Sequence, residues 1–272
     1  MKVAVREDGF EGNAALLPIE MVFRRIVELG YDGVEIRTFP EDSFGAIPWM
    51  GRRRRRGIWA EDLEKADRVQ LRAIADSLDL DVSSLSTAWA WPYSELNSLE
   101  SWGRGVEILK KDIELASDLG AGVILMHMGA TKGTWDKIKA IFCELAVEAE
   151  NYGVKLGYES NLWHRLGLGE IDTLVEMLED IGSRYLGVYH HSRYPRAGLP
   201  PQEEVRLIGD RLVGVHSGAI DHTMDYESYF RALKDVGYDG YWVFEVKGES
   251  IIESKKAWDK LMARYGEKNS PG

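Results

Sequence analysis

The sequence predicts a single (β/α)8 barrel, and two observations lead to this fold class. Short apolar runs alternate along the chain with segments whose apolar residues recur every three or four positions. Strict alternation of strand and helix implies parallel strands joined by helical crossovers. The 272 residues, taken as one domain over 1–272, divide into eight units of about 34 residues, which is the usual size for this barrel.

The predicted strands follow one another at regular intervals, and each is short enough to cross a barrel once. They are Val3–Val5, Val34–Thr38, Val82–Ser86, Val123–His127, Lys155–Glu159, Leu186–His190, Leu212–His216 and Tyr241–Val246. The clearest helical spacing lies at 99–116, 171–181 and 226–236. An open doubly wound sheet is the alternative, but it normally carries a G-x-G-x-x-G loop after an early strand, and this sequence has none.

Two similar segments near the chain ends support the repeated unit. The segments ELGYDGVEI (28–36) and DVGYDGYWVFE (235–245) each contain a helix end, Gly-Tyr-Asp-Gly and the start of a strand. The first glycine of each suits the left-handed residue that follows a helix. The first and last crossovers therefore look alike, as a barrel of repeated units requires.

Composition excludes several classes of protein. The chain has 34 lysines and arginines against 45 aspartates and glutamates, a net charge of −11 that repels a nucleic acid backbone. Cys143 is the only cysteine, so an intrachain disulfide and a cysteine-rich zinc module are both excluded. The opening segment MKVAVREDGF has no apolar run of the length that a signal peptide needs, and no stretch of the sequence approaches the ~20 apolar residues of a membrane span. We expect a cytoplasmic protein with no nucleic acid or membrane partner.

The connection after the second predicted strand is long and unusually basic. It covers about 39–60 and contains five consecutive arginines, Arg52–Arg56. Such a run is typical of a solvated loop whose charges repel one another. The alternative is a lid, or a contact that attracts an anionic substrate or the acidic face of another subunit.

All six histidines lie at or just after the carboxyl ends of predicted strands. They are His127, His164, His190, His191, His216 and His222, and Glu245 follows at the end of the last strand. In a (β/α)8 barrel these ends form one face, on which the active sites of the fold are built. Any single histidine could be a structural residue, but the clustering indicates a site.

Four residues form a candidate metal set. They are Glu159, His191, His216 and Glu245, which end four successive strands and can converge near the barrel axis. Two imidazoles and two carboxylates suit Mn²⁺, Co²⁺, Fe²⁺, Ni²⁺ or Zn²⁺ better than Ca²⁺. The alternative for either glutamate alone is a buried ion pair. His190 and His191 point to opposite sides of their strand, so only one can enter the site, and we assign His191 to the metal.

At these residues the sequence resembles the sugar isomerase and epimerase family of xylose isomerase-like TIM barrels, which includes tagatose 3-epimerase-like enzymes, hydroxypyruvate isomerase and inosose dehydratase. The resemblance extends over nearly the whole chain, through LGYDGVEI, LGAGVILMHMG, AENYGVKLGYES, VGVHSG and GYDGYWVFE. The family pattern of glutamate, aspartate, histidine and glutamate around one divalent metal carries over to Glu159, His216 and Glu245. His191 stands where the family usually has the aspartate, and Tyr194 where it has a substrate-contacting histidine.

The resemblance implies one divalent metal ion and a carbohydrate enzyme. Because His191 removes a negative charge from the family set, borderline metals should be favoured; we expect Mn²⁺, with Co²⁺, Zn²⁺, Fe²⁺, Ni²⁺ or Mg²⁺ as alternatives. The implied reaction is isomerisation or epimerisation of a sugar, keto-sugar or polyol through a metal-stabilised enediolate. Glu159 and Glu245 are the implied catalytic acid and base.

Three further residues are candidates for substrate binding. His127 and His190 either hydrogen-bond sugar hydroxyls or support the metal ligands. Trp163 belongs to five tryptophans in the predicted loops of this face, the others being Trp49, Trp59, Trp89 and Trp91. These rings either stack on a sugar or pack the long loops and a subunit interface.

Two other functions remain open at this point. The same metal and base could serve a lyase or dehydratase, in which the intermediate expels a leaving group. A non-catalytic sugar-binding barrel would bind metal weakly and exchange no proton. The DNA-repair endonuclease branch of the fold needs a basic face, and the composition argues against it. We also expect a homo-oligomer, either a dimer or a tetramer.

Overall fold

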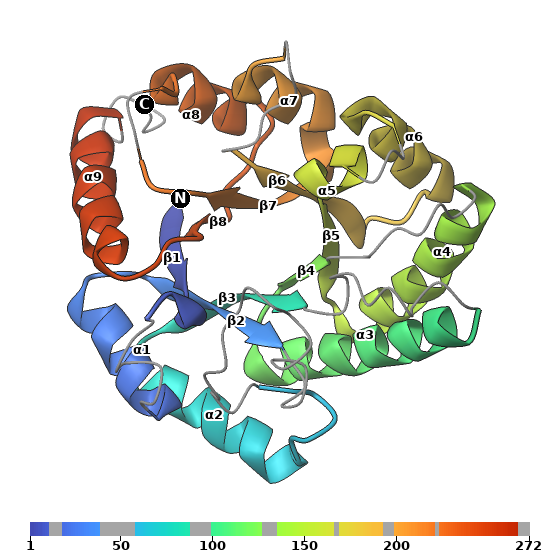
Figure 1. Cartoon of the computed structure of the whole chain (residues 1–272), viewed down its shortest axis with the longest axis horizontal. Coiled ribbons are helices and arrows are strands. Elements are labelled where there is room, and N and C mark those ends of the chain that lie inside the picture. The colour runs from blue at the N-terminus through green and yellow to red at the C-terminus, as the bar shows by residue number, and fades with distance from the viewer. Residues whose placement is uncertain are drawn as a thin grey trace.

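Eight parallel strands close into a barrel in the order of the sequence. The computed structural model describes residues 1–10, 18–38, 58–87, 99–126, 135–165, 169–192, 199–220 and 223–265. The strands are β1 (Lys2–Arg6), β2 (Gly33–Thr38), β3 (Asp81–Thr87), β4 (Val123–Met126), β5 (Lys155–Glu159), β6 (Leu186–His191), β7 (Leu212–Ser217) and β8 (Tyr241–Phe244). Pairing of β1 with β8 completes the ring (Figure 1). The predicted (β/α)8 barrel is confirmed.

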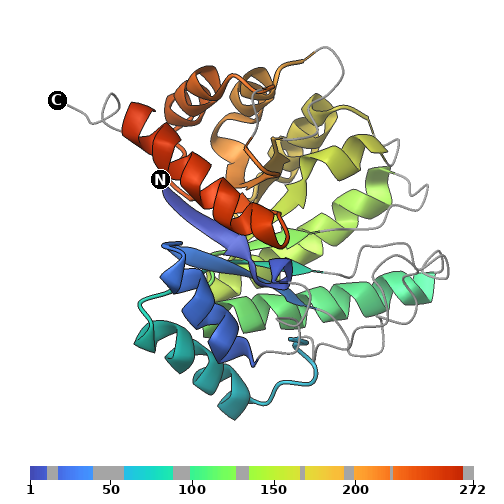
Figure 2. The same ribbon diagram turned by 60° about the vertical axis from the view of Figure 1, so that its left-hand side comes forward.

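The helices form an outer layer around the strands, as both ribbon views show (Figures 1 and 2). They are α1 (Ile19–Glu28), α2 (Lys65–Ser77), α3 (Leu99–Leu119), α4 (Trp135–Tyr152), α5 (Ser160–Arg165), α6 (Ile171–Ile181), α7 (Pro201–Ile208), α8 (Tyr226–Asp235) and α9 (Glu249–Tyr265), with short 3-10 turns at Glu7–Gly9 and Gly209–Arg211. None of the helices in the described ranges has the length and apolar character needed to cross a membrane.

Local sequence explains where individual helices begin, end and pack. In α1, Val22, Phe23 and Ile26 recur on one face and are fully buried against the barrel. Helix α8 begins after Asp225, whose carboxylate accepts a hydrogen bond from the backbone N–H of Ser228 at 3.1 Å. Helix α6 ends at Gly182, which adopts the left-handed conformation with φ of 75°.

Alternate strand residues face two different cores. The larger core lies between the strands and the helices and contains, for example, Val5 and Ile36. The smaller core lies inside the barrel and contains Ala4, Leu125, Tyr189 and Val243. The apolar filling inside the barrel thus lies below the polar residues at the carboxyl ends of the strands.

The ring of Tyr189 fills the barrel interior because a neighbouring strand provides a glycine. A Cβ atom added to Gly214 on β7 would overlap the Tyr189 ring, and one added to Gly157 on β5 would lie 3.0 Å from the Tyr189 Cβ. The pairing of β6 with β7 also shifts in register between Val188 and Tyr189. The Tyr189 ring fits here only because glycines lie beside it, and the polar residues above the ring depend on that fit.

Some strand ends differ from the prediction. Strand β6 extends by one residue to His191, and β8 ends at Phe244 rather than Val246. Glu245 is still held beside β7, since its backbone N–H donates to the Ser217 carbonyl at 2.8 Å. The arginine run Arg52–Arg56 lies outside the described residues, so its role stays a prediction.

We predict that Gly214→Ala lowers the free energy of unfolding by about 1–3 kcal/mol, because the added methyl group overpacks the barrel against Tyr189. Gly103→Ala is the matched control. Gly103 lies within α3 with no atom within 4 Å of the added Cβ, and alanine there should stabilise by about 0.5–1 kcal/mol. Urea denaturation measures both, and equal effects would contradict the packing described here.

Candidate metal centre

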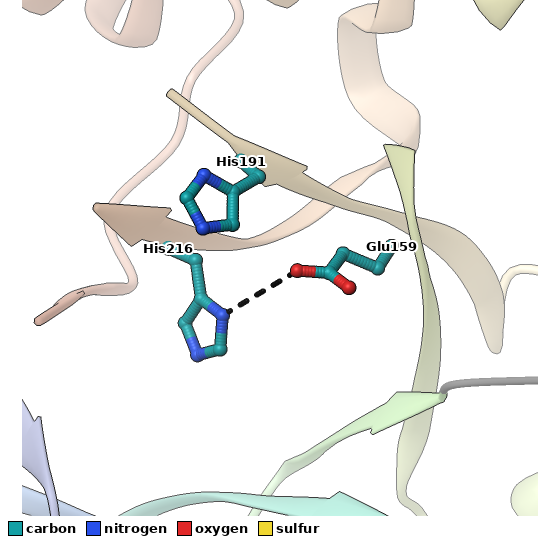
Figure 3. Close-up of side chains that lie close together, drawn as sticks. All are labelled: Glu159, His191 and His216. Atoms are coloured by element: carbon teal, nitrogen blue, oxygen red, sulfur yellow. Dashed lines mark ion pairs between the residues drawn. The ribbon is translucent and has the colours of Figure 1, made fainter. Parts of the chain in front are cut away.

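Three ligand-type side chains converge above the core inside the barrel. Glu159 ends β5, His191 ends β6, and His216 lies one residue before the end of β7. One ligand atom from each lies within 4.8 Å of the other two, and all three residues are buried. Figure 3 shows the side chains pointing toward one another from three neighbouring strands. His191 and His216 are register partners, which places their rings edge to face with centroids 5.8 Å apart.

The His216 ring lies between two carboxylates. Its Nε2 is 2.8 Å from Glu35 Oε1, while its Nδ1 is 3.8 Å from Glu159 Oε1. Nδ1 is buried and has no hydrogen-bond partner among the described residues. Burial by itself lowers the pKa of His216, but the charge of Glu35, the neighbouring Glu159 carboxylate and the charge of Glu245 outweigh burial and raise that pKa to about 10. The two carboxylates thus favour a positive charge on the His216 ring or beside it.

Glu245 lies beside this cluster and not within it. Its Oε2 is 3.1 Å from His191 Nε2, and its other carboxylate oxygen accepts a hydrogen bond from Arg6. Burial raises the pKa of Glu245, but the charge of Arg6 and the hydrogen bond from His191 outweigh burial and bring that pKa far below its usual range. The structure thus brings together three of the four predicted ligands and places the fourth in contact with one of them.

A buried ion-pair cluster on β1 and β2 supports Glu245. Arg6 makes two contacts with Asp8, at 3.0 Å and 2.7 Å, in addition to its contact with Glu245. Arg37 pairs with the same aspartate at 2.6 Å. Both arginines are at least 90% buried, and the charges of Asp8 and Glu245 help to keep the pKa of Arg6 well above its ordinary value in spite of burial. The cluster fixes the Glu245 carboxylate at the edge of the site.

Glu35 is a residue of the site that sequence reasoning missed. It lies in the middle of β2 and is fully buried. Besides His216, the Ser84 hydroxyl donates to it at 2.7 Å and the Tyr189 hydroxyl at 3.1 Å. The available signal was a lone carboxylate inside the strand GVEIRT.

His190 occupies the opposite side of β6 from His191. It is fully buried, with Nδ1 2.7 Å from the Tyr229 hydroxyl on α8 and Nε2 2.9 Å from Glu204 Oε2 on α7. Both ring nitrogens are thus engaged within the layer between strands and helices. The structure therefore does not bring His190 to the converging ligands, because neighbouring strand residues face opposite sides.

Trp163 also faces away from the site. It is only 1% exposed, its Nε1 donates to Thr173 Oγ1 at 2.9 Å, and its ring packs edge-on against Tyr158 at 5.5 Å. The structure therefore does not bring Trp163 to the converging ligands, because α5 directs this side chain into the helical layer. Trp59 is buried as well. The structure does not describe Trp49, Trp89, Trp91, His127, His222 and the side chain of His164.

Comparison with known proteins now identifies the family. Residues 23–267 match the family model described as xylose isomerase-like TIM barrel. The chain belongs to this family. The predicted resemblance is confirmed.

Individual relatives agree with this assignment. Fructoselysine 3-epimerase of Shigella flexneri is 27% identical over 91% of this chain and 93% of its own length. L-ribulose 3-epimerase of Mesorhizobium japonicum is 29% identical over 59% of this chain and 61% of its own. A solved D-tagatose 3-epimerase-like protein shares the fold, with a TM-score of 0.72, 20% identity and coverage of 99% and 100%. The prediction of an isomerase- or epimerase-like enzyme is confirmed.

We predict that Arg6→Met lowers the free energy of unfolding by about 3 kcal/mol, because it removes one partner from a buried ion-pair cluster. The control is Arg24→Met, which breaks an exposed pair with Glu20 and should cost less than about 1 kcal/mol. Chemical denaturation at neutral pH compares the two variants. Losses of the same size would show that the Arg6 cluster contributes no more than a surface pair.

Proposed function

We propose that this chain is a divalent-metal-dependent epimerase that inverts C3 of a ketose or ketose derivative. The observation that carries the proposal is the convergence of Glu159, His191 and His216, with the buried Nδ1 of His216 left facing the Glu159 carboxylate. An unpaired buried nitrogen is costly unless something binds it. A cation coordinated by Nδ1 and by Glu159 would satisfy both groups.

The donor set fits the predicted kind of metal. Two imidazoles and one carboxylate lie close enough to share one ion, and Glu245 is next to His191 as a fourth ligand. Nitrogen donors favour Mn²⁺, Fe²⁺, Co²⁺ or Zn²⁺ over Mg²⁺ and Ca²⁺, and Mn²⁺ is our first expectation. The ion would be held jointly by Glu159, His191, His216 and Glu245.

Epimerisation at C3 requires that a proton leaves carbon on one face and returns on the other. When bound, the metal would polarise the neighbouring carbonyl and make the C3 proton more acidic. Glu159 ends β5 and Glu245 directly follows β8, three places away around the ring, so their carboxylates approach from different sides. One carboxylate would accept the proton and the other would deliver one. Arg6 holds Glu245 in a fixed orientation at this edge.

The named relatives support the position of the reaction. Fructoselysine 3-epimerase and L-ribulose 3-epimerase both carry the 3-epimerase name. In 2-ketoses C3 is bonded directly to the carbonyl carbon, so polarisation of that carbonyl by a metal assists removal of the C3 proton. We therefore place the substrate among 2-ketoses and their derivatives.

We predict that the Mn²⁺-loaded protein exchanges the C3 proton of a ketose for deuterium in D₂O. The panel contains L-ribulose, fructoselysine, D-fructose and a keto-inositol, and NMR follows both exchange and epimer formation. Glu159→Gln should slow exchange by about 10²–10⁴-fold, because a neutral amide cannot accept the proton. Metal content is measured for each variant, since glutamine is also a poorer ligand.

Glu203→Gln on the exposed face of α7 controls for the substitution itself and should leave exchange unchanged. Epimers of unchanged mass apart from deuterium support the proposal, whereas loss of water would identify the lyase alternative. Metal binding without exchange on any member of the panel would contradict the epimerase and favour a binding protein.

A further inference from the structure

The structure assigns a positioning role to Glu35: we propose that it fixes the tautomer of His216 and thereby presents Nδ1 to the metal. This inference rests on the metal site proposed above. Glu35 is on β2, on the other side of the His216 ring from the converging ligands, and both residues are fully buried. Glu35 would therefore act through His216 and not on the substrate.

The geometry gives each nitrogen of His216 a separate task. An ionised carboxylate can only accept a hydrogen bond, so Nε2, at 2.8 Å from Glu35 Oε1, must carry a proton. In a neutral imidazole, a proton on Nε2 leaves the lone pair on Nδ1. Nδ1 is the nitrogen that faces Glu159 and lacks a hydrogen-bond partner among the described residues. Glu35 thus selects the ligating nitrogen.

Glu35 is itself held by donors that bind a different oxygen. The hydroxyls of Ser84 and Tyr189 both donate to Oε2, at 2.7 Å and 3.1 Å, while His216 contacts Oε1. The Tyr189 ring is in turn fixed against Gly214. Because each carboxylate oxygen has its own hydrogen-bond partners, the carboxylate cannot rotate away from His216 without losing them.

The same arrangement of hydrogen bonds predicts the effect of replacing Glu35 with glutamine, which has nearly the same shape. In Glu35→Gln, the two hydroxyl donors would bind the single amide oxygen at the Oε2 position. The amide NH₂ would then occupy the Oε1 position and donate to Nε2 of His216. A donor at that position places the lone pair on Nε2 and the proton on Nδ1, which is the tautomer that cannot bind the ion beside Glu159.

A second buried glutamate–histidine pair provides a matched control. Glu204 contacts His190 Nε2 at 2.9 Å and is also almost fully buried, but this pair lies on the outer side of β6. Glu204→Gln makes the same chemical change to a buried pair without facing the metal ligands. A loss of stability should therefore be common to both variants, whereas a loss of metal affinity should be confined to Glu35→Gln.

The experiment measures Zn²⁺ affinity by calorimetry for the wild-type chain and both variants, using Zn²⁺ as a diamagnetic probe. We expect Glu35→Gln to weaken binding by about 10–100-fold and Glu204→Gln to leave it unchanged. Long-range ¹H–¹⁵N spectra of the Zn²⁺-loaded wild type should show His216 protonated on Nε2 and metal-bound through Nδ1. The spectra need no variant, so they test the proposal even if Glu35→Gln does not fold.

Several results would overturn the inference. Wild-type affinity in Glu35→Gln, an equal loss in Glu204→Gln, or metal bound through Nε2 of His216 would each contradict the role of Glu35 while leaving the metal site in place. Failure of the wild-type chain to bind Zn²⁺ would instead contradict the metal site itself, and with it the proposed function.

Discussion

The site depends on one buried imidazole held between two carboxylates. His216 contacts Glu35 through one nitrogen and faces Glu159 with the other, and all three residues are buried. Burying two carboxylates around one ring is costly unless positive charge compensates them. A proton supplies this charge when no metal is bound, and a divalent ion would supply it together with His191. The polar interior of the barrel is therefore built around the compensation of charge at this point.

The closed barrel provides the rigid frame that this arrangement needs. Strand alternation places Tyr189 and His191 on the same side of β6, so the ring that fills the barrel and a predicted metal ligand come from one strand. Tyr189 also connects the apolar filling to Glu35 through its hydroxyl. Packing below the site and hydrogen bonding within it are thus coupled through a single side chain. On the far edge, Arg6 and Asp8 hold Glu245.

Sequence reasoning located the fold and the face of the site because both follow from simple periodicity. Alternating strand and helix signals define the barrel, and residues at strand ends must then share one face. Glu35 was not predicted as a site residue because it lies inside a strand. A single carboxylate there forms no recognisable motif until its partner on a distant strand is known. Arg6 was missed for the same reason, since its partner Glu245 is brought beside it only by closure of the barrel.

Two predicted substrate contacts, His190 and Trp163, face away from the converging ligands for a shared physical reason. His190 and Trp163 lie near strand ends in the sequence. This position does not determine whether a side chain points into the barrel or outward toward the helices. His190 neighbours an inward-facing residue and so must face outward. Trp163 lies on α5, which follows β5 without a loop, and its side chain packs within the layer of helices. The position of a residue in the sequence indicates at which end of the barrel it lies. Whether its side chain faces into the barrel or outward is known only from the register of the strands.

The most direct test of this account is the anomalous diffraction of crystals grown with Mn²⁺. The account predicts one anomalous peak per chain, within bonding distance of Glu159, His191 and Nδ1 of His216, while Nε2 of His216 keeps its contact with Glu35. A map without a peak at these residues, or a direct hydrogen bond closing the gap between His216 and Glu159 in crystals saturated with Mn²⁺, would contradict it.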